Sequence, residues 1–311
     1  MPPAGNDAPP AEGLTPVRSL LFIPADDEKK LAKGVASGAD VLLLDLEDSV
    51  AAARKEAARA IVSQYIAATR PLAGRPRLYV RINALDTPHW QADLAGIIGA
   101  QPEGLLLPKA RSGEDVHTLS VALHGAEEKA GYTIGSTRII ALATEVPISL
   151  LQLHTYVGCS GRLDALTWGA EDLSAAVGAR ANREADGRWT SPYELARNLC
   201  LFTANAAGVA ALDTVYVNFR DEAGFRREAQ AAARDGFSGK MAIHPAQVPI
   251  INEVFTPSAE ETAFAQEIIA AFAANPEAGV IGIRGHMVDR AHIAGAERIL
   301  ARAKTAAAQG G

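Results

Sequence analysis

The stretch LLLDLEDSV, residues 42–50, joins a continuous apolar run to three closely spaced acids. Consecutive apolar positions are typical of a parallel strand that is covered on both faces. Asp45, Glu47 and Asp48 follow at the point where such a strand would end. Because α/β folds bind ligands at the carboxyl ends of their parallel strands, the stretch predicts a buried strand that opens on a polar site.

Seven further apolar runs of similar length alternate with longer, Ala-rich helical patterns along the chain. The eight runs are SLLFIPA (19–25), DVLLLDLE (40–47), LYVRIN (78–83), GLLLPK (104–109), RIIALATE (138–145), ALTWGAED (165–172), TVYVN (214–218) and KMAIHP (240–245). Eight strand–helix repeats within roughly 230 residues predict an α/β fold of the TIM (β/α)8 barrel type. A doubly wound open sheet is the main alternative, but no G-x-G-x-x-G or P-loop signature follows any run.

Composition divides the chain into four expected segments. Residues 1–16 are rich in Pro, Ala and Gly and predict a disordered leader, and residues 304–311 predict a frayed tail. Residues 17–255 are expected to form the barrel, and residues 256–303 a C-terminal helical extension. The barrel is expected to be one domain, because no Gly, Ser or Pro cluster inside it reads as a linker.

The overall balance of residues is that of an ordinary globular protein. Of 311 residues, 48% are hydrophobic and 21% charged, with a formal net charge of −6. Basic residues are neither in excess nor clustered, so a nucleic-acid partner is not expected. No apolar run approaches the roughly 18 residues of a membrane span. Cys159 and Cys200 have no metal-like spacing and suit a reducing cytoplasm.

Most of the eight runs end in polar or ionisable residues. These are Asp45, Glu47, Asp48, Arg81, Asn83, Lys109, Glu145, Glu171, Asp172, Asn218 and His244. In a TIM barrel they would converge on one face, where neighbouring carboxylates cannot all stay ionised without a cation. Oxygen ligands favour a hard ion such as Mg²⁺, with Glu145 and Asp172 as the best direct ligands. Arg81 would then be free to bind a substrate carboxylate through two hydrogen bonds.

Each of these residues also has a structural interpretation. Asp48 precedes a helical pattern that it could cap, and Arg81 could simply pair with one of the acids. Lys109 could face water, and His244, which precedes a proline, could pack or bond to the backbone. The functional interpretation is favoured because one predicted face gathers the whole set.

Eight motifs, in chain order, resemble those of the citrate lyase β-subunit-like proteins. They are RSLLFIPA, ADVLLLDLEDSV, ARKEAAR, YVRINALDTP, LLLPKA, WGAEDL, GFSGKMAIHPAQV and INEVFTPS. These proteins belong to the HpcH/HpaI aldolase superfamily, which includes malyl-CoA and citramalyl-CoA lyases. The resemblance implies a TIM barrel, a Mg²⁺ cofactor and a homotrimer or hexamer. It also implies reversible carbon–carbon cleavage of a 3-hydroxyacyl-CoA of malyl-, citramalyl- or citryl-CoA type into an acyl-CoA and a 2-oxo acid.

The resemblance assigns roles to individual residues. Glu145 and Asp172 match the metal ligands, and Arg81 matches the arginine that holds the oxo-acid carboxylate. Glu47 and Asp48 match acids beside the metal that order water and orient Arg81, whereas the role of Asp45 is less defined. Lys109 is assigned to substrate binding together with Arg81.

The segment GHMVDRAHIAGAERIL resembles the C-terminal part of the family. There, an aspartate after a Met–aliphatic pair reaches the active site of the next subunit. Asp289 is therefore the candidate acid/base, carried on an extension that packs on a neighbouring subunit. Without the resemblance, Asp289 would read as a surface acid near an amphipathic C-terminal helix.

Three positions depart from the family pattern. Ile148 and Ser149 replace an Arg–Gly pair after the metal-binding glutamate, and Asn218 replaces an aspartate that ends the seventh strand. Residues 25–27, Ala-Asp-Asp, replace a glycine followed by a small polar residue and an arginine.

The departures at residues 148–149 and 25–27 concern loops expected to meet the acyl or CoA part of the substrate. Basic residues that could attract CoA phosphates, or form a solvated helix face, are Arg18, Lys33, Lys55 and Arg59. A class II aldolase that acts on 2-oxo acids without CoA is therefore an alternative. Another is the β subunit of a citrate-lyase-like complex with a carrier-bound acyl group.

Overall fold

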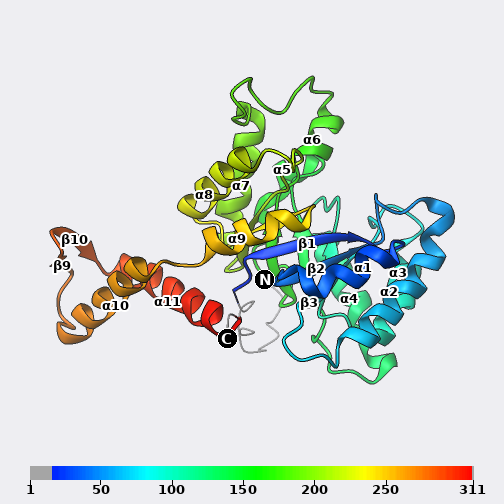
Figure 1. The fold of residues 1–311 in the computed structure, drawn as a ribbon, viewed down its shortest axis with the longest axis horizontal. Coiled ribbons are helices and arrows are strands. Elements are labelled where there is room, and N and C mark those ends of the chain that lie inside the picture. The colour runs from blue at the N-terminus through cyan, green and yellow to red at the C-terminus, as the bar shows by residue number, and fades with distance from the viewer. Residues whose placement is uncertain (1–15, 310–311) are drawn as a thin grey trace, which may run out of the picture. The chain divides into compact units, whose positions relative to one another are not determined.

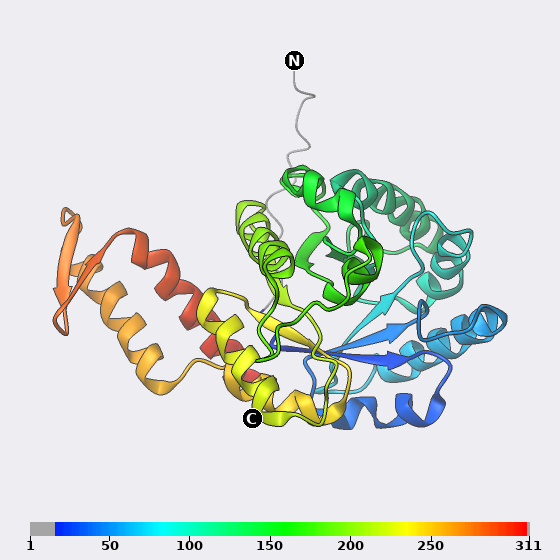
Figure 2. The same cartoon turned by 90° about the horizontal axis from the view of Figure 1, so that it is seen from above.

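The computed structural model describes residues 16–309, in which eight parallel strands close into a barrel in sequential order. The strands are β1 (Ser19–Pro24), β2 (Val41–Asp45), β3 (Arg77–Arg81), β4 (Gly104–Leu107), β5 (Arg138–Leu142), β6 (Leu163–Thr167), β7 (Ala210–Asp213) and β8 (Gly239–Ala242). Helices lie outside the strands (Figures 1 and 2). They are α1 (Glu28–Gly34), α2 (Lys55–Thr69), α3 (Trp90–Ile97), α4 (Gly113–Ala130), α5 (Pro147–Gln152), α6 (Ala170–Val177), α7 (Ser191–Ala206), α8 (Glu222–Asp235) and α9 (Val248–Phe255). The predicted TIM barrel is confirmed.

The packing explains why the strands are apolar at every position. Leu43, Leu106 and Ile140 belong to the apolar cluster formed by the barrel strands. Leu42 and Leu44 alternate with Leu43 along β2 and are also completely buried. Successive side chains of a strand point to opposite faces, so β2 is covered on both sides and ends in a buried carboxylate, that of Asp45.

The predicted seventh strand was wrong. Residues 214–218 were expected to form it, but β7 is Ala210–Asp213, so Asp213 and not Asn218 ends the strand. Tertiary contacts override the local β-propensity here. The fully buried ammonium of Lys240 donates to the Asp213 carboxylate at 2.6 Å and to the Thr214 carbonyl at 2.8 Å.

The sixth run also ends earlier than predicted. Strand β6 stops at Thr167, and Glu171 and Asp172 lie in the first turn of α6. The chain leaves the sheet at Trp168 and Gly169, and α6 begins at Ala170. The two acids are therefore held by a helix N-terminus next to the barrel opening, where negative charge is favoured.

A second compact unit begins at Glu253. It contains α10 (Ala259–Ala274), the antiparallel strands β9 (Val280–Ile283) and β10 (His286–Asp289), and α11 (Ala291–Gln309). Arg284 and Gly285 both have positive φ, as a tight hairpin turn requires. The extension predicted as helical thus also carries a hairpin.

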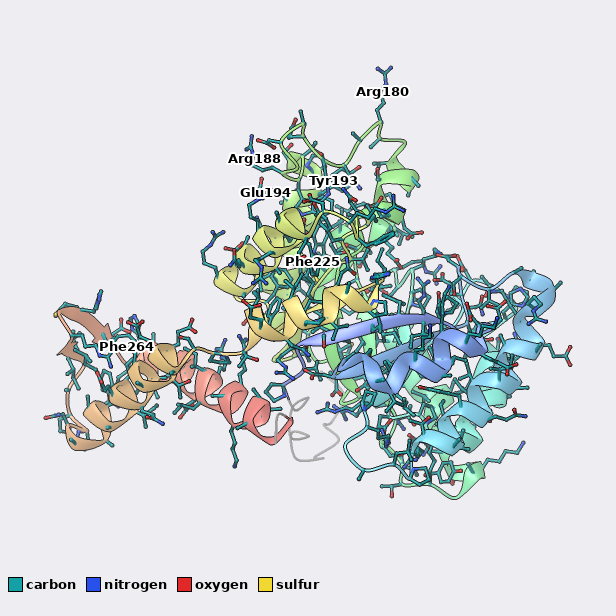
Figure 3. The ribbon with its side chains drawn as sticks, in the orientation of Figure 1. Arg180, Arg188, Tyr193, Glu194, Phe225 and Phe264 are labelled. Carbon is teal, nitrogen blue, oxygen red and sulfur yellow. The ribbon has the colours of Figure 1, made fainter. Side chains whose placement is uncertain are left out.

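Apolar side chains of both helices and the hairpin form the core of this unit. Ile268, Phe272 and Val288 are buried in it, and Phe264 on α10 packs against them (Figure 3). Helix α11 continues to Gln309, and its last turns are rich in Ala, a strong helix former, so the helix extends into the segment expected to be a frayed tail. Residues 1–15, which make up most of the predicted leader, and residues 310–311 lie outside the described part.

No helix within residues 16–309 combines the length and the apolar character needed to cross a membrane.

Candidate active site

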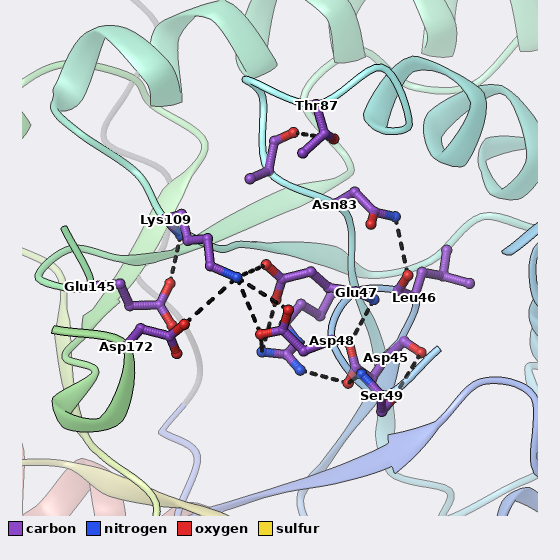
Figure 4. A network of polar contacts seen from close by, with 12 residues as sticks. Asp45, Leu46, Glu47, Asp48, Ser49, Asn83, Thr87, Lys109, Glu145 and Asp172 are labelled. Atoms are coloured by element: carbon purple, nitrogen blue, oxygen red, sulfur yellow. Dashed lines mark hydrogen bonds and ion pairs between the residues drawn. The ribbon is translucent and has the colours of Figure 1, made fainter. Parts of the chain in front are cut away.

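A pocket of about 410 Å³ opens at the carboxyl end of the barrel. Its polar lining residues are Asp45, Asp48, Ser49, Arg81, Glu145, Glu171, Asp172 and Thr214. Its apolar lining includes Phe22 and Met241. Glu47 and Lys109 are not part of this lining. Glu47 pairs with Arg81, which lines the pocket, and Lys109 in turn donates to Glu47 (Figure 4). The barrel therefore brings together most of the polar residues predicted at the strand ends.

Arg81 is anchored at the barrel opening by ion pairs with acids at the end of β2 and just after it. Its Nε and Nη2 donate to the two carboxylate oxygens of Asp45 at 2.7 and 2.6 Å. Its Nη1 lies 2.9 Å from Glu47 Oε2, and its guanidinium carbon lies 4.9 Å from the centre of the Phe22 ring. Burial alone would raise the pKa of Asp45, but the hydrogen bonds and charge of Arg81 hold that pKa below its usual value. Asp45, the acid with the least defined expected role, is the main partner of Arg81.

Lys109 joins the acids of three chain segments. Its Nζ donates to Glu47 Oε1 at 2.5 Å and to both oxygens of Asp48 at 3.2 Å. The same Nζ lies 3.7 Å from Asp172 Oδ1. Lys109 has a φ of +50°, in the left-handed region that non-glycine residues rarely adopt. This strained backbone lets Lys109 direct its N–H to Glu145 Oε2, at 2.6 Å, and its ammonium to the other acids.

Glu145 is a buried carboxylate that no charged donor satisfies. It is 3% exposed, and within residues 16–309 its only hydrogen bond comes from the Lys109 backbone. Burial, and then the charge of Asp172, raise the pKa of Glu145 to about 8. A Cβ at Gly169 would lie 2.6 Å from Glu145 Cγ, so the absence of a side chain at Gly169 makes room for this carboxylate.

The donor set fits a magnesium ion. Within residues 16–309 no three His, Cys, Asp or Glu side chains gather closely enough to enclose a metal. Mg²⁺ differs from Zn²⁺ in needing only one or two protein carboxylates, with water and substrate oxygens completing the shell. Glu145 and Asp172 supply two such carboxylates, and a cation between them would remove the repulsion that raises the pKa of Glu145.

Asn218, His244 and Asp289 are not among the residues that line the pocket. Asn218 is exposed, and His244 caps the turn Pro245–Gln247 and stacks on Phe219, with 4.8 Å between ring centres. Asp289 belongs to the second compact unit, where it ends β10 and pairs with His292 Nδ1 at 2.7 Å.

The basic residues considered for CoA phosphates have other partners. Arg18 binds Asp40 near the amino ends of β1 and β2, and Arg59 donates to Asp93 at 2.7 Å. Lys55 is 8% exposed and donates to backbone carbonyls, so neither the phosphate nor the solvated-face interpretation holds for it. Lys33 is exposed.

Gly169 and the inward-turned Lys55 were missed by the sequence reasoning. The only signal for Gly169 was its position two residues before the first acid of WGAED.

Comparison with known proteins gives a family for this chain. Residues 18–245 match the model of the HpcH/HpaI aldolase/citrate lyase family. The chain is 35% identical to the citrate lyase subunit beta of Leuconostoc mesenteroides subsp. cremoris, over 91% of this chain and 92% of that protein. It is 33% identical to the mitochondrial citramalyl-CoA lyase of Rattus norvegicus, over 92% of this chain and 85% of that protein.

A solved structure extends the likeness to the fold. The protein CitE of Mycobacterium tuberculosis, in complex with magnesium, acetoacetate and coenzyme A, superposes with a TM-score of 0.74 at 33% identity. The match covers 93% of this chain and 98% of that one. The barrel, the acidic pocket and these matches together show that the chain belongs to the HpcH/HpaI aldolase/citrate lyase family.

Proposed function

We propose that this chain is a Mg²⁺-dependent carbon–carbon lyase. It would cleave or form a 3-hydroxyacyl-CoA of malyl-, citramalyl- or citryl-CoA type, to or from an acyl-CoA and a 2-oxo acid. The observation that carries the proposal is the buried Glu145 carboxylate, which no charged donor satisfies and which shares one pocket with Asp172 and the guanidinium of Arg81. Relatives named as lyases, and a relative solved with magnesium, acetoacetate and coenzyme A, support this assignment.

Glu145 and Asp172 are the residues that would hold the ion. Bound Mg²⁺ would supply Lewis-acid stabilisation of the negative charge that develops on the oxo-acid oxygen. Arg81 would donate to the substrate carboxylate, because the Asp45 fork uses only two of its five N–H groups. Asp45 also holds the guanidinium in one orientation, which lowers the entropic cost of binding the carboxylate.

The polar side of the pocket would be completed by Lys109, Glu47 and Asp48. The Lys109 ammonium neutralises these two acids and approaches Asp172. We assign Lys109 to substrate binding at the pocket edge, and Glu47 and Asp48 to ordering water there. Their contacts with Arg81 and Lys109 keep the charges of this side of the pocket balanced before the substrate arrives.

Proton transfer would fall to Asp289 of a neighbouring subunit in a homotrimer or hexamer. In the synthetic direction a base must remove a proton from the carbon next to the thioester. Within its own unit, Asp289 has an exposed carboxylate, and its hydrogen bond with the His292 side chain lowers its pKa. Asp289 would therefore be ionised at neutral pH, as a base must be.

Mixing two inactive variants tests this assignment. Asp289→Asn and Glu145→Gln subunits, each inactive alone, should regain activity after co-refolding. Random assembly gives about one quarter of sites with both native residues if each site is shared between subunits. Continued inactivity of a verified mixed oligomer, or full activity of Asp289→Asn alone, would remove Asp289 from the mechanism.

A substrate panel tests the reaction itself. Acetyl-CoA or propionyl-CoA is combined with glyoxylate, pyruvate or oxaloacetate, with Mg²⁺ and with a chelator. We expect condensation of at least one pair, abolished by the chelator and restored by added Mg²⁺. Activity that survives chelation would contradict the metal assignment.

A class II aldolase without CoA is a second candidate, favoured by the acids after β1. Asp26 lies 3.7 Å from Arg54, and Asp27 caps α1. Two carboxylates close to Pro24, which lines the pocket, would oppose the approach of polyanionic CoA. Free aldehydes that react with oxo acids while CoA esters stay inert would favour this candidate.

A β subunit of a citrate-lyase-like complex is the third candidate, supported by the names of its relatives. Activity only on a carrier-bound acyl group would favour it. For all three candidate functions we infer a cytoplasmic location, because Cys159 and Cys200 are both free thiols.

A further inference from the structure

Lys55, the first residue of α2, directs its ammonium into the protein instead of the solvent. It is 8% exposed, and its Nζ donates to the carbonyl oxygens of Leu46 and Glu47 at 2.8 and 3.0 Å. Within residues 16–309 no carboxylate lies within ion-pair distance of Lys55. A buried ammonium without an ionic partner is costly, and a surface helix would ordinarily leave such a lysine in water. The position of Lys55 is therefore not explained by an ion pair or by exposure to solvent.

A second group of residues holds the same carbonyl. Asn83 Nδ2 donates to the Leu46 carbonyl at 3.1 Å (Figure 4) and to Asp93 Oδ2 at 2.7 Å. Asp93 is completely buried and also accepts from Arg59 and from the Asn83 backbone. Asn83 follows Arg81 by two residues, so one set of bonds ties the end of β3 to the segment after β2.

The segment held in this way, residues 45–50, is called the acid loop below. Inside it, Glu47 N–H donates to Asp45 Oδ1 at 2.9 Å, and Val50 N–H donates to the Glu47 carbonyl at 3.1 Å. The side chains of Glu47 and Asp48 leave the other side of this loop and reach Lys109. A displacement of the Leu46 and Glu47 carbonyls would therefore move the contacts of Lys109 and the Asp45 fork on Arg81.

Lys55 also places a positive charge next to the acid loop, outside the residues that line the pocket. The charges of Asp45, Glu47 and Asp48 all act on Lys55, although none of the three carboxylates bonds to it. Arg81 and Lys109 neutralise the same acids from the pocket side. Lys55 is absent from the pocket lining, so substrate and ion would not displace it.

We propose that Lys55 is a positioning residue for the lyase reaction, a role that rests on the proposed function. It fixes the main chain of the acid loop, together with Asn83, and balances the charge of the loop without touching the substrate. Glu47 and Asp48 then meet Lys109 and Arg81 in a geometry that is set before the substrate binds.

Three variants test the proposal. Lys55→Met keeps the alkyl chain and removes the ammonium, whereas Lys55→Arg keeps a cation. Arg162→Met is the matched control, because it removes another buried cation that bonds to Glu127 at the opposite end of the barrel. Each full-length variant is measured for kcat, for KM of the oxo acid, for Mg²⁺ affinity by calorimetry and for amide hydrogen exchange of residues 46–50.

Lys55→Met should lower kcat by roughly 10- to 100-fold, the usual effect of losing a group that orients direct contacts. KM and Mg²⁺ affinity should change much less, since Arg81, Glu145 and Asp172 are intact. Amide exchange at Glu47 and Val50 should become about tenfold faster or more, and Lys55→Arg should restore much of both properties. Arg162→Met should lose stability without faster exchange in the acid loop or a lower kcat per folded molecule.

The opposite results would overturn the proposal. Unchanged kcat and unchanged exchange in Lys55→Met would exclude a positioning role, and so would equal exchange changes in Arg162→Met. If Lys55→Met does not fold, Asn83→Ser removes the other donor to the Leu46 carbonyl and should show the same pattern more weakly; normal exchange there would refute the role. If the native protein turns over no substrate of the panel, the proposed function fails, while the exchange data still decide whether Lys55 fixes the loop.

Discussion

Glu127 and Glu145 are both buried glutamates of the same barrel, 0% and 3% exposed, yet their surroundings are opposite. Glu127 lies near the amino ends of β5 and β6 and accepts two hydrogen bonds from Arg162, at 2.9 and 2.7 Å. Backbone N–H groups of Gly135 and Thr137 donate to it as well, each at 2.7 Å. Glu145, at the carboxyl end, accepts one backbone N–H and faces Asp172.

The two pKa values move in opposite directions from the same starting point. Burial raises both, but Arg162 and the backbone N–H groups hold the pKa of Glu127 at about 2. For Glu145, burial and the charge of Asp172 raise the pKa to about 8. A buried carboxylate that is paired with a cation of the protein, such as Glu127, stabilises the fold. A buried carboxylate without such a cation, such as Glu145, favours the binding of a cationic ligand.

Glu145→Gln should have the largest effect, on activity and on Mg²⁺ binding, without loss of stability. The amide keeps the shape but removes the charge that holds the ion, so kcat/KM should fall by about 10³-fold. Mg²⁺ binding by calorimetry should be lost together with turnover, while the free energy of unfolding stays equal or rises. Normal Mg²⁺ binding in this variant would contradict the role of Glu145 as a metal ligand.

Glu127→Gln should have the reverse effect. Removing one partner of a buried ion pair leaves Arg162 uncompensated, and the free energy of unfolding in urea should fall by about 3 kcal/mol. The kcat per folded molecule should match that of the native protein. Stability that does not change would mean that the Arg162 pair contributes no more than a surface pair.

The stability of the metal-free protein should depend on pH in a predictable direction. The folded-state pKa of Glu145, about 8, lies above its ordinary value of 4.5, so the folded state holds the proton more tightly. The stability that this group contributes is present below pH 4.5 and is lost as the pH rises towards 8. The loss should be of the order of 2 kcal/mol after relaxation of the site.

Thermal unfolding at several pH values checks this sign. Added Mg²⁺ should raise Tm more at pH 9 than at pH 6, and Glu145→Gln should abolish the difference. Glu127 has the opposite sign: its contribution is present above pH 4.5 and is lost as the pH falls to about 2. A Mg²⁺ effect that is larger at pH 6 would contradict the unneutralised state of Glu145.

Gly169→Ala should have the smallest effect. Its Cβ would lie 2.6 Å from Glu145 Cγ, so the carboxylate must shift, and Mg²⁺ affinity should fall by roughly tenfold, as overpacking by one methyl group suggests. Gly161→Ala is the matched control, because its Cβ would meet nothing within 4 Å. Equal affinities in the two variants would show that Gly169 does not constrain Glu145.

Local patterns sufficed for most of the barrel but not for the seventh strand. The run TVYVN has the stronger β-propensity, yet Ala210–Asp213 pairs with β6 and β8. The deciding contact is the buried Lys240, whose partners lie 26 and 27 residues away in the chain. Lys55 was likewise not predictable from local sequence. The pattern ARKEAAR indicates a solvated helix face, whereas the carbonyl that accepts from Lys55 lies on the loop before the helix.

By itself, the sequence determined the eight strand–helix repeats, the apolar strands covered on both faces, and the set of polar residues at the strand ends. These are properties of spacing and residue type, which act locally. Only the tertiary structure decided which acid meets which cation. The register of β2 and β3 places Asp45 opposite Arg81, and Arg162 reaches Glu127 from 35 residues away. Hydrogen bonds and charges act through space, so two glutamates that are alike in the sequence became a structural ion pair and a proposed metal ligand.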